Sequence, residues 1–188
     1  MAGPGRGRWS RRLGKADRAA TARAAILRAV GDARASGGAA PTVTDVVSRL
    51  GIGRNTFYEH FDDVLAAIGA ADAAAAERTS LALEAALGSA RTPIEKLRAL
   101  SRTWIDRAAA TPQWTLTGRD LPPLERALRD VLSEARAAGV VGRVPDAARV
   151  RCLAGAFAGI CLDGPPRSAE DRDDRAEILV DFALRAFR

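Results

Sequence analysis

The sequence predicts an all-α protein with an N-terminal three-helix domain and a C-terminal helical bundle. Alanine and arginine dominate the composition, while valine, isoleucine and aromatic residues are sparse, and alanine loses no side-chain entropy in a helix. Apolar residues recur at three- and four-residue intervals, and no alternating stretch is long enough for a strand. Because 47% of the 188 residues are hydrophobic, the chain can form a real core.

The first helix is expected over residues 15–36. Ile26 and Val30 belong to its apolar stripe, and two glycines at 37–38 end it. Residues 1–15 are rich in glycine and arginine and have no apolar period, so we expect a disordered basic arm there.

Two short helices joined by a tight turn are expected over residues 42–61. Thr42 and Asp45 have the spacing of a capping box at the start of the first helix. Its apolar stripe consists of Val43, Val46, Val47 and Leu50. Residues 51–53, Gly-Ile-Gly, break this helix, and a second follows over 54–60. Phe57 and Phe61 lie on the inner face of that second helix, and the unit reads as a helix-turn-helix.

The rest of the chain predicts a helical body over residues 65–188, after a three-helix domain over 16–64. Caps, prolines and glycines place its helices at residues 62–87, 93–110, 111–118, 122–139 and 145–162. A charged loop over 164–173 then leads to a final helix. We expect one face of that helix to carry Ile178, Leu179, Phe182, Ala183 and Phe187.

Basic charge is concentrated in the first third of the chain. Residues 1–61 hold 11 Lys and Arg against 4 Asp and Glu, whereas residues 62–188 hold 18 against 19. This asymmetry is typical of a domain that binds a polyanion, attached to a neutral body. A solubilising basic tail beside an ordinary domain explains the same numbers.

The second helix of the helix-turn-helix has the residues that base recognition requires. The major groove of DNA admits one helix and shows each base pair as a distinct pattern of donors and acceptors. Arg54 suits guanine, Asn55 suits adenine, and Thr56 completes the polar N-terminal end of this helix. Thr42, with the free amides at the start of its helix, can hold a phosphate.

The stretch from Thr42 to Phe61 resembles the DNA-binding domain of the tetracycline-repressor (TetR) family. Its most specific part is the Thr-Phe-Tyr-x-His-Phe core at residues 56–61. The resemblance implies a homodimer that binds an inverted repeat in double-stranded DNA, and a body that releases DNA when a small molecule binds. By the family pattern, Tyr58, His60 and Thr42 contact phosphate. We assign Thr44, Arg11, Arg12 and Lys15 to the same DNA-binding set.

Three positions depart from the family pattern. Gly53 replaces a common serine, and Asn55 replaces a common glycine, which alters the expected sequence preference. Val64 stands where a phosphate-binding lysine is often found, so one contact is missing. The basic arm at residues 1–15 either compensates by following the DNA backbone or remains a solvated tail.

Aromatic residues in the alanine-rich body suggest a ligand pocket. Its candidate lining consists of Trp104, Arg107, Trp114, Thr117 and Phe157. The alternative is that these aromatic side chains fill the core. The effector is not identifiable from the sequence.

A dimer interface is expected on the last two helices. Gly155 and Gly159 allow close helix approach, and Ile178 and Phe182 lie on the final helix. An inverted repeat requires a two-fold axis. The alternative for the glycines is close packing within one subunit.

Other classes of protein are disfavoured. No apolar run is long enough to span a membrane, and the start lacks a signal peptide, so we expect a cytoplasmic protein that joins the nucleoid on DNA. Cys152 and Cys161 read as free thiols. No cofactor, metal site or catalytic motif is expected, and the protein is not predicted to be an enzyme. The alternative to operator binding is nonspecific DNA binding or action through protein contacts.

Overall fold

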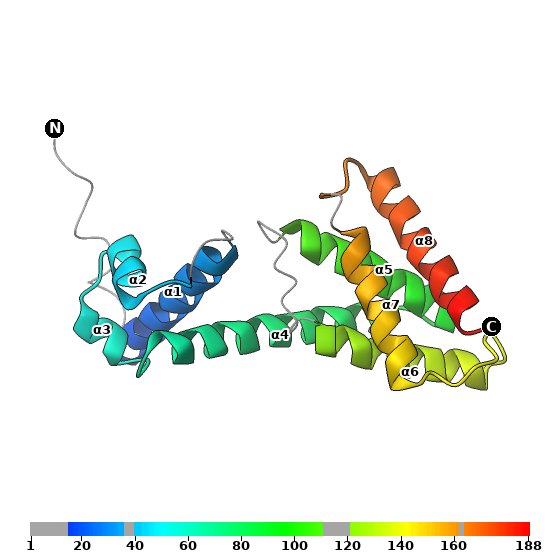
Figure 1. The fold of residues 1–188 in the computed structure, drawn as a ribbon, viewed down its shortest axis with the longest axis horizontal. Helices are drawn as coiled ribbons and strands as arrows, with labels where there is room; N and C mark the ends of the chain where they lie inside the picture. Colours follow the sequence, from blue (N-terminus) through cyan, green and yellow to red (C-terminus); the bar gives the residue numbers. More distant parts are fainter. Residues whose placement is uncertain (1–14, 36–39, 111–120, 162–163) are drawn as a thin grey trace. The chain divides into compact units, whose positions relative to one another are not determined.

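A computed structural model describes residues 15–35, 40–110, 121–161 and 164–188, and these residues form eight α-helices (Figure 1). They divide into two compact units, a head that ends at Ala71 and a body that begins at Asp72. The boundary lies inside the long helix α4 (Val64–Gly88), seven residues later than the boundary expected from the sequence. The shift has a packing cause, since Ala67 is buried in the core of the head and Ile68 packs against it.

The head contains α1 (Lys15–Ala35), α2 (Val43–Leu50), α3 (Arg54–Tyr58) and the start of α4. Its core confirms the inner faces expected for the two short helices. The buried residues are Ile26, Ala29, Val30, Val46, Val47, Phe57, Phe61 and Ala67. The predicted arm at residues 1–15 lies outside the described residues, apart from Lys15 in the helix.

The turn between α2 and α3 depends on one glycine conformation. Gly51 has a φ of +65°, and its N–H donates to carbonyl oxygens in the last turn of α2. This left-handed conformation is open to glycine at little cost. Helix α3 ends at Tyr58, two residues earlier than expected, because a tight turn follows in which the amide of His60 donates to the carbonyl of Phe57.

The body contains the rest of α4, then α5 (Pro93–Ala110), α6 (Leu121–Ala137), α7 (Ala147–Ile160) and α8 (Ala169–Ala186). Helix α5 packs on α8 and α6, and α7 packs on α6 and α8. The large side chains that the body buries include Trp104, Phe157, Phe187, Leu97, Leu128 and Leu132. The expected start of α5 is confirmed, since Thr92 and Glu95 form a capping box.

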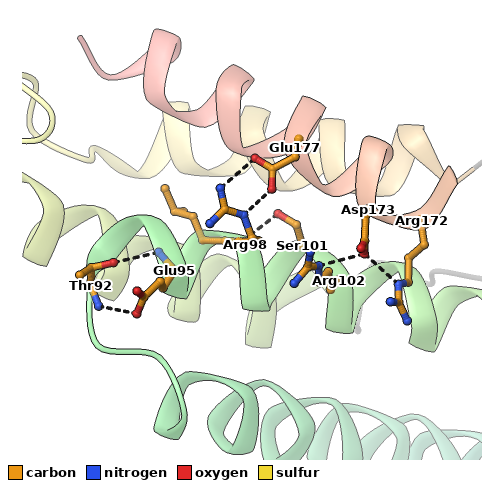
Figure 2. Close-up of polar contacts among 9 residues, drawn as sticks. Thr92, Glu95, Arg98, Ser101, Arg102, Arg172, Asp173 and Glu177 are labelled. Atoms are coloured by element: carbon orange, nitrogen blue, oxygen red, sulfur yellow. Dashed lines mark hydrogen bonds and ion pairs between the residues drawn. The ribbon is translucent and has the colours of Figure 1, made fainter. Parts of the chain in front are cut away.

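Ion pairs connect the exposed edges of α5 and α8. Figure 2 shows Arg98 and Arg102 of α5 facing Glu177 and Asp173 of α8. The guanidinium of Arg98 binds both carboxylate oxygens of Glu177, which lowers the pKa of that carboxyl below its usual value. These side chains are partly exposed, so each pair contributes little stability.

Helix α8 begins earlier than the sequence indicated. The expected loop over 164–173 was too long, because the hydroxyl of Ser168 accepts from the amide of Asp171 and caps a helix that starts at Ala169. The first turns of α8 are charged and have no apolar period to reveal them. Helix α7 starts at Ala147 behind the cap Asp146 and ends at Ile160, two residues before the expected end, because the amide of the capping residue Cys161 turns back to Ala158 and Gly159. The expected helix over 111–118 lies outside the described residues.

Candidate DNA-binding surface

Helix α3, the second helix of the helix-turn-helix, is anchored by its aromatic inner face and leaves its polar side chains in solvent. Phe57 is fully buried, and Phe61 packs beside it with 5.9 Å between the ring centroids. Arg54 and Asn55 are exposed, and Thr56 is half-buried. Helix α3 therefore has the apolar back and polar front that a helix in the major groove needs.

Arg54 is held by a residue of the preceding helix. Its Nη2 donates a hydrogen bond of 2.8 Å to the hydroxyl oxygen of Thr44, and both side chains are exposed. Thr44 lies in the first turn of α2, and Arg54 is the first residue of α3. The two side chains therefore form a single polar unit at the N-terminal ends of both helices.

Thr42 is engaged by Asp45. Its backbone N–H and its hydroxyl donate to the same carboxylate oxygen, at 2.8 and 2.7 Å, and its hydroxyl oxygen accepts from the amide of Asp45. The two bonds that the carboxylate accepts, first the one from the hydroxyl and then the one from the backbone N–H, lower the pKa of Asp45 below its usual value. A carboxylate thus stands at the helix start where the sequence suggested a phosphate site.

Tyr58 and His60 follow the exposed residues of α3. Tyr58 is 51% exposed, and its ring meets Phe57 edge-on, with the centroids 5.6 Å apart. His60 is half-buried in the turn after the helix. The phenol and the imidazole remain candidates for phosphate contact.

Arg23 of α1 is a cation that the sequence did not single out. Its guanidinium lies over the ring of Phe61, 5.2 Å from the centroid, while the side chain stays exposed. A cation held in this way is a further candidate for phosphate contact. Its position depends on how α1 packs against Phe61, which follows α3, and spacing along the sequence does not reveal that packing.

The helix-turn-helix itself carries no excess of positive charge. Residues 40–71 hold two arginines, Arg49 and Arg54, against four acidic residues, Asp45, Glu59, Asp62 and Asp63. The basic excess of the head comes from residues 1–39, which hold nine Lys and Arg against two Asp. Of the predicted contacts there, Arg11 and Arg12 lie outside the described residues, as does the side chain of Lys15.

Several solved structures share the fold of this chain, the helix-turn-helix head and the helical body, over most of their length. A regulatory protein of the TetR family from Rhodococcus RHA1 matches with a TM-score of 0.73 at 15% identity, over 88% of this chain and 96% of its own. The fatty acid degradation regulator FadR from Bacillus halodurans matches with 0.71 at 14%, over 93% and 97%. The ketosteroid transcriptional regulator KstR2 of Mycobacterium tuberculosis matches with 0.63 at 15%, over 86% and 92%.

The chain has the tetracycline-repressor fold. This confirms the predicted class, an all-helical chain with a helix-turn-helix head and a helical body. No protein-family model and no curated protein matches the sequence.

Within the body of this tetracycline-repressor fold, two of the candidate pocket residues pack into the core. Trp104 is 1% exposed, Phe157 is fully buried, and the indole Nε1–H of Trp104 donates 3.0 Å to the carbonyl oxygen of Phe157. Arg107 is half-buried on α5, and Trp114 and Thr117 lie outside the described residues. Where the structure describes the candidates, it therefore favours the core-filling alternative.

A shallow groove opens between α4 and α6 of the body. Its lining residues are Ser80, Leu83, Glu84, Leu87, Pro123, Arg126, Ala127 and Asp130, and its volume is about 80 Å³. Pockets that enclose drug-sized ligands measure roughly 300–1,000 Å³. This groove is too small for such a ligand.

The candidate dimer residues lie on the outside of α7 and α8. Among the described residues, and apart from the backbone of α7 itself, no atom lies within 4 Å of a Cβ placed on Gly155 or Gly159. Ile178 is 60% exposed and Phe182 is 47% exposed. The single apolar face expected for the last helix was wrong: Leu179, Ala183 and Phe187 are buried, whereas Ile178 and Phe182 face solvent.

The two thiols differ in exposure. Cys152 is exposed on α7, and burial raises the pKa of Cys161 to about 11. Across the described ranges, no three His, Cys, Asp or Glu side chains gather in a way that could hold a metal ion. No helix in those ranges is long and apolar enough to cross a membrane.

Proposed function

We propose that the protein is a transcriptional regulator that binds an inverted-repeat DNA operator as a homodimer. The observation that carries the proposal is the exposed Arg54 and Asn55 on a helix anchored by Phe57, in a head of the tetracycline-repressor fold. Arg54 reads guanine and Asn55 reads adenine in the major groove. Thr56 assists, while Tyr58 and His60 bind phosphate; Thr42, engaged by the carboxylate of Asp45, is left out of the phosphate contacts. Such a protein works in the cytoplasm, on the nucleoid when bound.

The dimer forms through the outward faces of α7 and α8. Exposed Ile178 and Phe182 supply apolar surface, and Gly155 and Gly159 allow close approach of a second helix. The two-fold axis brings two heads to two half-sites one helical turn apart, which is about 34–36 Å. Within the part of the chain that the structure describes, no other segment lies within 4 Å of a Cβ placed on either glycine.

The effector is a small organic molecule that binds the body and favours release from DNA. Two proteins with this fold are a fatty acid degradation regulator and a ketosteroid transcriptional regulator, and this likeness supports a small-molecule effector. Trp114, Thr117 and Arg107 are its proposed contacts. Repression follows if the operator overlaps a promoter.

Phosphate affinity comes mainly from the basic arm. Residues 40–71 are acidic on balance, and Val64 replaces an expected lysine, so the charge available is the nine cations of residues 1–39, five of which belong to the arm at residues 1–15. Arg11, Arg12 and Lys15 follow the DNA backbone or enter the minor groove. Arg23, held over Phe61, adds a contact from α1.

A specific observation favours the alternative of action without operator binding. Residues 40–71 hold four acidic residues against two arginines, and the carboxylate of Asp45 occupies the start of α2. A segment of this charge could leave DNA binding to the arm alone, which is nonspecific, or contact another protein.

Selection from a randomised DNA duplex pool separates the two functions. The purified protein enriches an inverted repeat if the proposal holds, and that repeat gives a sharp footprint in the DNA upstream of its own or neighbouring genes. Uniform binding that disappears with added salt supports the nonspecific alternative. Absence of DNA binding at low salt contradicts both DNA-binding functions and leaves action through protein contacts.

A further inference from the structure

We propose that Thr44 determines DNA sequence specificity by orienting the guanidinium of Arg54, without reading a base itself. This inference rests on the proposed function of the head. It assigns Thr44 a positioning role, where the sequence alone placed it among the DNA contacts.

The geometry joins the first turns of the two helices. Nη2 of Arg54 lies 2.8 Å from the hydroxyl oxygen of Thr44, ten residues earlier in the chain. Among the described residues this is the one hydrogen bond or ion pair that the guanidinium makes. Both side chains are exposed, so the bond stands on the surface that the proposed function turns toward DNA.

The hydrogen bond leaves Arg54 able to read a base. A guanidinium has five N–H groups, and the major-groove edge of guanine accepts two hydrogen bonds, at O6 and N7. One hydrogen on Nη2 binds Thr44, while the other hydrogen on Nη2 and one on Nη1 can bind guanine. Thr44 therefore fixes the plane of the fork without occupying the donors that recognition needs.

The advantage is preorganisation. An exposed arginine samples many rotamers and loses that freedom when it binds a base. A hydrogen bond already formed in the free protein removes part of that loss. It also restricts the guanidinium to one direction, so the wrong base pair at that position is rejected more strongly.

The test is a double-mutant cycle read at single base pairs. The probes are the duplex that the wild-type protein selects from a randomised pool and duplexes with each base pair of one half-site changed in turn. The proteins are wild type, Thr44→Val, Thr44→Ser, Arg54→Ala, and Thr44→Val combined with Arg54→Ala. Affinities are measured by fluorescence anisotropy, and unfolding temperatures identify any variant that does not fold.

Arg54→Ala is expected to abolish discrimination at one G·C base pair, a loss of about 5- to 150-fold. Thr44→Val is expected to lose about 2- to 10-fold at the same base pair, and Thr44→Ser to retain discrimination. In the Arg54→Ala background, Thr44→Val should have no further effect. Thr44→Ser keeps the proposal testable if the Thr44→Val protein does not fold. Serine retains the hydroxyl, so changed discrimination in the Thr44→Ser protein contradicts a positioning role for that group.

Three results overturn the proposal while leaving the proposed function intact. These are a Thr44→Val effect at a different base pair, an effect that adds to that of Arg54→Ala, and unchanged discrimination in a folded Thr44→Val protein. A wild-type protein that enriches no sequence contradicts the proposed function itself, and this inference with it.

Discussion

The carboxylate of Asp45 accepts hydrogen bonds from both the backbone N–H and the hydroxyl of Thr42, at 2.8 and 2.7 Å. The box is closed by the amide of Asp45, which donates 3.3 Å to the hydroxyl oxygen of Thr42. A negative charge thus lies at the positive end of α2 and stabilises the helix. The same charge opposes a DNA phosphate at that helix start, which places more of the phosphate binding on the arm.

The capping box predicts a pH dependence of head stability. The folded-state pKa of Asp45 is lowered from its usual value of 3.8, mainly by the hydrogen bond from the Thr42 side chain. A lowered pKa means that the ionised carboxylate stabilises the fold above the unfolded value, and that this stability is lost as the pH falls through the folded value. Asp45→Asn should therefore speed amide hydrogen exchange in residues 43–61 at neutral pH.

The difference between the Asp45→Asn variant and wild type should shrink to nothing in strong acid, where both side chains are neutral. Both proteins contain the other carboxylates with lowered pKa values, such as Glu177, so comparing the two proteins at each pH cancels the contribution of those groups to the pH dependence. An exchange difference that is constant from neutral pH to strong acid contradicts the assigned role of the charge.

Trp104→Phe should destabilise the body by about 2–4 kcal/mol. The change removes the donor to the buried carbonyl of Phe157, near the end of α7, and leaves a gap beside it. Urea unfolding followed by circular dichroism measures the loss. Leu81→Ala is the control, because Leu81 is 59% exposed on α4 and should change stability by less than about 0.5 kcal/mol. Equal stability of Trp104→Phe and wild type argues against the hydrogen bond.

Phe182→Asp should convert a dimer to a folded monomer. Phe182 is exposed in the single chain, so its replacement leaves the core of the body intact while placing a charge in the proposed interface. Sedimentation equilibrium measures the mass, and Leu81→Asp, which changes an exposed leucine outside the proposed interface, should remain dimeric.

Alkylation of Cys152 gives a second measurement of the same interface. Cys152 is exposed on the face of α7 that carries Gly155 and Gly159, so dimerisation should protect it, and Phe182→Asp should expose it. Cys161 should stay unreactive in both proteins, because burial raises its pKa to about 11. A wild-type protein that is monomeric at micromolar concentration contradicts the proposed dimer interface.

Removal of residues 1–14 should weaken DNA binding and reduce its salt dependence. This segment carries four arginines, including Arg11 and Arg12. Each cation that neutralises a phosphate contributes about 0.9 to the slope of log affinity against log salt concentration. The truncated protein should therefore show a slope smaller in magnitude by up to about 3.6. An unchanged slope identifies the arm as a solvated tail.

Local features of the head were readable from the sequence because they depend on neighbours along the chain. The capping pair Thr42 and Asp45 is three residues apart, and Phe57 and Phe61 are one helical turn apart. The hydrogen bond from Arg54 to Thr44 depends instead on the angle between two helices, and the position of Arg23 over the ring of Phe61 depends on the packing of α1. Neither relationship follows from spacing.

The body shows where apolar pattern alone is insufficient. Ile178 and Leu179 are both aliphatic and adjacent, so the sequence assigned them to one face, yet a helix turns by about 100° between them. Packing against α5 and α7 buries Leu179 and leaves Ile178 in solvent. The sequence allows Trp104 either to line a cavity or to fill the core. In the structure its indole N–H bonds the carbonyl of Phe157 within the core.

The specificity ratio tests the central claim most directly. It is the affinity for the selected inverted repeat divided by the affinity for a scrambled duplex of the same length and composition, measured at physiological salt. A helix-turn-helix that reads bases through Arg54 and Asn55 predicts a ratio of about 10³ or more. A ratio near one would contradict operator recognition and leave only the charge of the arm to bind DNA.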